Sequence, residues 1–216
     1  LGRADRACRC RVPGRNRMKA DVCVVAAGLL LALSAPAFGH SPIEGIDSFY
    51  AGFLHPLFVP AHVLVILTFG ILMGQQGVRS MQPAVIAFLL AVAVGLVVIG
   101  LVPDVSVGVW LTIAAVCVGL LVALAQPLPL ALNLVLGGLV GLLLGLDSTQ
   151  AELVGGERLA ALLGSGIATY LLVLYAMVFA EYFSRAAWQR IGLRVIGSWS
   201  AAASILVATL SLSPAA

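Results

Sequence analysis

Six long apolar stretches, separated by short polar breaks, limit most strongly how this chain can fold. They run approximately over residues 52–74, 83–102, 107–125, 128–146, 159–182 and 191–211. Each approaches the length of about 20 residues with which an α-helix crosses a bilayer. Only 10% of the residues are charged, whereas soluble domains carry about 25%. We therefore predict an all-α, polytopic transmembrane bundle with about six spanning helices.

Turn-forming residues mark the breaks between these stretches. They cluster at 75–77, 103–104, 126–129 and 147–158. The third and fourth stretches are joined by a very short link, so an odd number of spans is the alternative to six.

The first 39 residues resemble an export signal. Met18 and Lys19 open a short positive region, residues 22–33 are apolar but too short to span, and residues 34–39 are small. We predict a signal peptide over 18–39, cleavage that leaves His40 as the mature N-terminus, and a transmembrane domain over 40–216. Residues 1–17 are interpreted as an upstream or non-native extension, with a long positive region of the signal as the alternative.

The charges beyond the signal indicate an orientation and exclude a nucleic-acid surface. From His40 onward there are five basic against seven acidic residues, which leaves no basic footprint. With the mature N-terminus outside, four arginines (79, 185, 190 and 194) fall in inner loops and only Arg158 in an outer one. This matches the positive-inside rule and predicts that the mature N-terminus faces outward.

Residue types within the spans predict how the helices pack. Small residues repeat every four positions at Gly70 and Gly74, and at Gly137, Gly141 and Gly145, a spacing that lets helix backbones approach closely in lipid. We further predict an ion pair between Glu181 and Arg185, an interhelical hydrogen bond at Asn133, a core position for Cys117, and interfacial aromatic residues at Tyr50, Trp110 and Trp188.

All three histidines of the chain fall in one window with two acids: His40, Glu44, Asp47, His55 and His62. Imidazole and carboxylate together suit divalent nickel, cobalt or zinc, and ionisable groups within a membrane segment are usually functional. On a straight helix His55 and His62 would lie about 10 Å apart, which is too far for one ion.

Two prolines change that geometry. Pro56 and Pro60 predict a kinked or unwound segment, and irregular backbone is tolerated where it lines a cavity. One site closed by the kink and two stations along a path both fit the spacing, and the plain alternative is that both histidines only pack against neighbouring helices.

The stretch from Gly52 to Leu64 resembles the HupE/UreJ family of hydrogenase and urease accessory proteins. That family's first signature is a histidine, five residues, an aspartate and a histidine. His55 and His62 match the two histidines, whereas Ala61 replaces the aspartate. The family's second, histidine-rich signature has no counterpart near 137–147. The resemblance implies a protein of the bacterial inner membrane that takes part in nickel uptake.

We therefore expect a nickel permease or metal-handling protein, with cobalt or zinc as other ions, no organic cofactor and no enzymatic activity. His40, Glu44 and Asp47 would capture the ion, His55 and His62 would pass it on, and Asp147 would compensate the missing aspartate. Lipid, maturation proteins of hydrogenase or urease, and a second copy of the chain are the expected partners. A non-transporting protein that docks partners through loop 147–158 is the alternative, and a haem-binding or other redox protein is a remote one.

Overall fold

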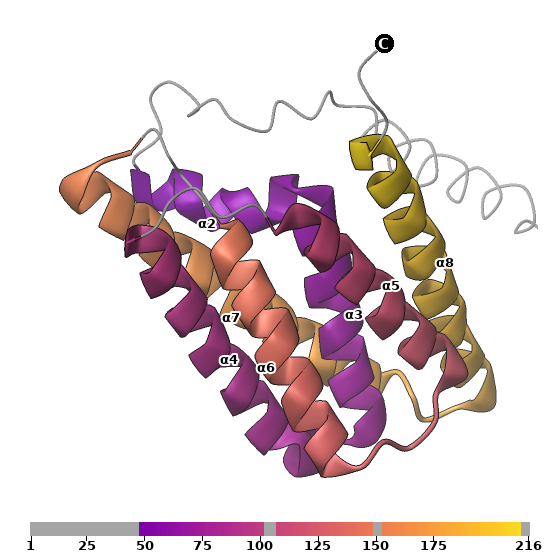
Figure 1. Cartoon of the computed structure of the whole chain (residues 1–216). Helices are drawn as coiled ribbons and strands as arrows, with labels where there is room; N and C mark the ends of the chain where they lie inside the picture. Colours follow the sequence, from indigo (N-terminus) through magenta and orange to yellow (C-terminus); the bar gives the residue numbers. More distant parts are fainter. Residues whose placement is uncertain (1–47, 102–106, 149–152, 213–216) are drawn as a thin grey trace, which may run out of the picture. The chain divides into compact units, whose positions relative to one another are not determined.

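The computed structural model describes residues 48–101, 107–148 and 153–212. These residues form helices and no strand (Figure 1), which confirms the all-α prediction. The helices are α2 (Ser48–Phe58), α3 (Pro60–Gln76), α4 (Val78–Leu101), α5 (Gly108–Leu124), α6 (Leu130–Asp147), α7 (Gly155–Tyr182) and α8 (Ala187–Leu212). The predicted signal peptide and its upstream extension lie outside the described residues.

The described helices support four to five membrane spans. Helices α4, α6, α7 and α8 are each long and apolar enough to cross a bilayer, and α2 with α3 would form a fifth, broken span. Helix α5 is apolar but has 17 residues, or about 25 Å, which is shorter than the hydrocarbon core of about 30 Å. A sixth span at α5 stays a prediction.

The helix ends follow from backbone chemistry. Helix α3 stops at Gly77, whose φ of 97° suits glycine alone, and α5 stops at Ala125, which is left-handed. Pro129 then precedes α6. The predicted breaks at 75–77 and 126–129 are therefore confirmed.

The break predicted over 147–158 is shorter than expected at both sides. Helix α6 continues through Asp147, and α7 already begins at Gly155. Glu157 and Arg158 consequently lie in the first turn of α7, where an acidic side chain suits the positive end of the helix dipole. The break predicted at 103–104 falls outside the described residues.

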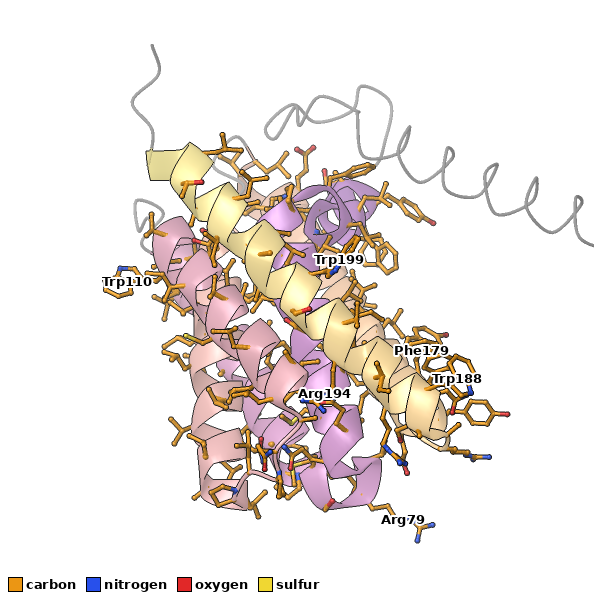
Figure 2. The ribbon with its side chains drawn as sticks, turned by 90° about the vertical axis from the view of Figure 1, so that its right-hand side faces the viewer. Arg79, Trp110, Phe179, Trp188, Arg194 and Trp199 are labelled. Atoms are coloured by element: carbon orange, nitrogen blue, oxygen red, sulfur yellow. The ribbon has the colours of Figure 1, made fainter. Side chains whose placement is uncertain are left out.

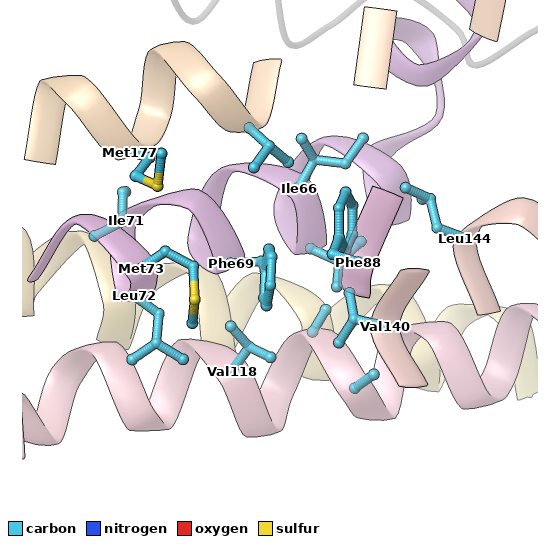
Figure 3. Close-up of a cluster of buried hydrophobic side chains, with 14 of the residues drawn as sticks. Ile66, Phe69, Ile71, Leu72, Met73, Phe88, Val118, Val140, Leu144 and Met177 are labelled. Carbon is cyan, nitrogen blue, oxygen red and sulfur yellow. The ribbon is translucent and has the colours of Figure 1, made fainter. Parts of the chain in front are cut away.

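Helix α3 is the centre of the described bundle, because it contacts every other described helix. Its side chains Ile66, Phe69 and Leu72 are fully buried. Figure 3 shows them among side chains of α4, α5, α6 and α7, and the rings of Phe69 and Phe88 stack with centroids 4.7 Å apart. His62, the one ionisable residue of α3, is likewise fully buried.

Glycine rows bring the helices close together. A Cβ added at Gly137 would lie 2.6 Å from the carbonyl oxygen of Ala84, and Gly141 and Gly145 meet the next carbonyls along α4 in the same way. Because both rows advance by four residues, α4 and α6 run parallel in register. Gly70 and Gly74 approach α7 as closely. Small residues thus replace the hydrophobic driving force that lipid cannot supply.

The bundle has two ends that we name by their residues. At the Gln76 end, Gln76 donates a hydrogen bond to the carbonyl of Gln126 and accepts one from the amide of Leu128. The four arginines predicted to face inward lie toward this end, whereas Arg158 lies at the opposite Asp147 end. Trp110 and Trp188 point away from the helices (Figure 2) and are exposed, as is Tyr50.

Three sequence predictions about polar and small residues are wrong. Glu181 makes no ion pair with Arg185 and instead accepts a hydrogen bond of 2.9 Å from the amide of Val78, because the first amides of a helix lack helical partners. Asn133 bonds to carbonyls at the start of its own helix rather than to a neighbouring helix. Cys117 is exposed, since it falls outside the row of α5 that packs inward.

Candidate metal site

The predicted kink lies between Phe58 and Pro60. Proline at the first position of α3 has no amide hydrogen, so a continuous helix would lose a hydrogen bond there. Val59 is extended, with φ −89° and ψ 110°, and the axes of α2 and α3 differ by 74°. A single residue thus separates two helical pieces.

This bend brings His55 and His62 together. His55 lies in the last turn of α2 and His62 in the first turn of α3. Their ring centroids are 5.2 Å apart, in an edge-to-face arrangement, in place of the roughly 10 Å along a straight helix. Of the two arrangements left open by the spacing, the geometry favours one site over two stations.

A carboxylate from a distant segment completes the group. Nε2 of His62 lies 2.9 Å from Oδ2 of Asp147, which ends α6. The imidazole is fully buried, whereas the Asp147 side chain is 22% exposed. The carboxylate proposed to replace the missing aspartate therefore lies beside His62.

The other ring nitrogen of His62, Nδ1, has an environment unlike that of Nε2. Nδ1 is buried and has no hydrogen-bond partner among the described residues. A buried polar atom without a partner costs about 1–3 kcal/mol, so such atoms in native proteins call for an explanation. Nδ1 is thus a polar atom for which the surrounding helices supply nothing.

Helix α5 begins beside Asp147. A Cβ added at Gly108, its first residue, would lie 3.5 Å from Oδ1 of Asp147. The positive end of a helix dipole near a carboxylate is stabilising. Sequence reasoning missed Gly108, and its only signal was a glycine at the predicted start of an apolar stretch.

The remaining predicted ligands are not placed. His40, Glu44 and Asp47 lie outside the described residues. Among the residues that are described, no three His, Cys, Asp or Glu side chains converge to hold one ion. The site therefore presents two imidazoles and one carboxylate that do not all point at a common centre.

Comparison with known families decides where the chain belongs. The family described as HupE / UreJ protein matches residues 28–207, which include α2 to α7 and most of α8. The chain belongs to the HupE/UreJ family. Searches of curated proteins and of solved structures gave no match.

In this HupE/UreJ protein the position of the signature aspartate is occupied by Ala61, which is nearly buried. The carboxylate beside the second histidine comes instead from Asp147, 85 residues further along the chain. The departure from the family pattern therefore does not leave His62 without an acidic partner.

Apolar side chains fill this HupE/UreJ protein beyond the site. Val65, Ile66 and Phe69 follow His62 along α3 and are fully buried, and the ring of Phe69 stacks on Phe88. An ion at His62 would be separated from the Gln76 end by this packed layer. In this conformation the site is closed toward that end.

Proposed function

We propose that this HupE/UreJ protein is an inner-membrane permease or metal-handling protein for a divalent cation, nickel first and cobalt or zinc next. The observation that carries the proposal is the meeting of His55, His62 and Asp147 at a break in a central helix. No organic cofactor and no enzymatic chemistry is part of it.

The chemistry of the three groups supports this choice of cargo. Imidazole nitrogen binds nickel, cobalt and zinc well. A nearby carboxylate offsets the cost of bringing a doubly charged ion into a membrane segment. Two imidazoles, with water completing the shell, form a site weak enough for an ion to leave, as conduction requires.

The proposed route begins outside. His40, Glu44 and Asp47 of the mature N-terminal stretch capture the ion and pass it to His55 and His62. Release toward the Gln76 end requires the layer around Phe69 to open. The membrane potential favours inward movement of a divalent cation by about 4–5 kcal/mol per 100 mV. The arginines at the Gln76 end support an orientation with that end inside.

Family membership supports a role beside metalloenzymes. We propose that the delivered ion serves maturation of a hydrogenase or urease, with the maturation proteins as inner partners and a second copy of the chain as a membrane partner. A haem role is not favoured, because the edge-to-face contact of the two histidine rings leaves no space for a porphyrin between them.

The test is uptake of radiolabelled nickel, with cobalt competition, in cells that lack nickel importers. His55→Ala and His62→Ala should both abolish uptake at unchanged protein level. Gly138→Ala is the matched control, because a Cβ at that position meets nothing within 4 Å. Uptake that survives in both histidine variants would refute the proposed route.

A non-transporting docking protein is the second candidate, and the closed apolar layer beyond His62 favours it. A well-expressed wild type with no uptake of nickel or cobalt above empty cells would favour this candidate. Substitutions in the link between α6 and α7, residues 148–154, should then weaken capture of the maturation proteins, whereas His55→Ala should leave capture unchanged.

A further inference from the structure

We propose that Asp147 is a positioning residue: it holds His62 with the proton on Nε2, so that Nδ1 is the atom offered to the metal ion. This inference rests on the proposed function, because it specifies how the same site would bind its ion. It assigns to Asp147 a task other than direct coordination.

The first step concerns the proton. Nε2 of His62 and Oδ2 of Asp147 are 2.9 Å apart. An ionised carboxylate can only accept hydrogen bonds, so Nε2 is the donor. The contact therefore selects one tautomer of the neutral imidazole, in which Nδ1 carries a lone pair.

The second step concerns the environment of that lone pair. The imidazole is fully buried, and Nδ1 has no hydrogen-bond partner among the described residues. A proton on Nδ1 would be a buried donor without an acceptor, which is costly. A cation is the partner that satisfies a buried lone pair, so this atom is suited to be a ligand.

The third step concerns where the ion would lie. Nδ1 and Nε2 are separate atoms of one ring and point in different directions. An ion on Nδ1 would therefore not meet the carboxylate oxygen that faces Nε2. This agrees with the absence of a three-residue cluster in the described ranges. His55, whose ring centroid lies 5.2 Å from that of His62, is the second ligand of the proposed site.

The arrangement has a general chemical advantage. A histidine whose second nitrogen donates to a carboxylate is fixed in orientation and is a more basic ligand. Loss of such a partner typically weakens metal binding about 10–100-fold, whereas loss of a ligand removes the site. The two roles of Asp147 therefore predict different sizes of effect.

The decisive experiment is nitrogen NMR on purified full-length protein with labelled histidine, titrated with diamagnetic Zn²⁺. The chain has three histidines, so single substitutions assign every signal. Before zinc, His62 should show a protonated Nε2 and an unprotonated Nδ1. Zinc should shift the Nδ1 signal and leave the Nε2 proton in place.

Zinc affinity of variants supplies the second readout. Asp147→Asn keeps an acceptor for Nε2 and should weaken binding about tenfold, Asp147→Ala should weaken it up to about a hundredfold, and His62→Ala should abolish it. Glu181→Gln makes the same acid-to-amide change at the opposite end and should bind zinc like the wild type.

Three outcomes would overturn the inference. Zinc bound at Nε2 would show that Asp147 does not hold the proton on that nitrogen. An Asp147→Asn variant as deficient as His62→Ala would make the carboxylate a direct ligand. In either case nickel uptake through His62 could still stand. No zinc effect on either nitrogen of His62 would sink the proposed site together with the inference. The wild-type spectrum gives an answer even if a variant fails to fold.

Discussion

Replacing His62 or Asp147 alone should lower the free energy of unfolding by unequal amounts. Asp147→Leu leaves a fully buried imidazole without its partner, and such a loss costs about 1–3 kcal/mol. Full burial favours the upper half of that range, about 2–3 kcal/mol. His62→Leu leaves a carboxylate that is 22% exposed and can be hydrated, so its cost should be nearer 1 kcal/mol.

The double variant should recover most of this loss. Replacing both members of a buried pair by apolar residues is often close to neutral. We therefore expect His62→Leu with Asp147→Leu to lie within about 1 kcal/mol of the wild type. The coupling energy between the two positions is the sum of the single costs less the cost of the double variant, and it should be about 2–4 kcal/mol, at the upper end of what groups in contact show.

Equilibrium unfolding in mixed micelles measures these quantities. The fraction of denaturing detergent is raised in the presence of a metal chelator, and the fluorescence of the three tryptophans reports the folded fraction. A second cycle combines His62→Leu with Glu181→Gln. Glu181 adjoins Gly74, twelve residues and about 18 Å along α3 from His62, so these two changes should be additive.

The result that would refute the reasoning is additivity at the pair itself. If the costs of His62→Leu and Asp147→Leu sum to that of the double variant within about 0.5 kcal/mol, the two side chains do not interact in the membrane protein. The positioning role of Asp147 would fall with that result.

Three further predictions use the same unfolding assay. Gly141→Val should destabilise the protein by about 1–3 kcal/mol, because its Cβ would meet the carbonyl of Phe88. Gly138→Ala on the same helix should be neutral or stabilising. Equal effects of the two changes would refute close packing of the α6 glycines against α4. Glu181→Ala should cost about 0.5–2 kcal/mol by exposing the first amide of α4, and Glu181→Gln should cost less; a harmless Glu181→Ala would show that this hydrogen bond contributes nothing. Phe88→Ala should cost about 3–5 kcal/mol because the ring is fully buried, and a loss below 1 kcal/mol would contradict a packed layer beyond His62.

The helices could be predicted from sequence because lipid imposes a simple rule. Apolar length and turn residues located every described helix approximately, and the glycines spaced by four mark close contacts between helices. The Pro60 break was also predictable, since proline cannot join a helix interior without losing a hydrogen bond. These features depend on neighbours in sequence.

The partners of polar residues were harder to predict. Glu181 has an arginine four residues away and yet bonds to the amide of Val78, 103 residues distant in sequence. Asn133 donates its hydrogen bonds to carbonyls at the start of its own helix. For Asp147 the sequence supported a charge at the correct end of the bundle, but contact with His62 depends on how the start of α3 and the end of α6 lie beside each other. The choice of nitrogen on His62 has no sequence signal at all.

Because the chain bends at the extended residue Val59, the bend and the binding of an ion are thermodynamically coupled. The two histidines belong to different helical pieces, so straightening the chain at Val59 would carry their rings from 5.2 Å toward about 10 Å. An ion held by both rings would resist straightening, and by thermodynamic reciprocity a force that straightens the chain would lower affinity for the ion. Motion elsewhere in the bundle that changes the angle between α2 and α3 would then raise or lower the affinity for the ion.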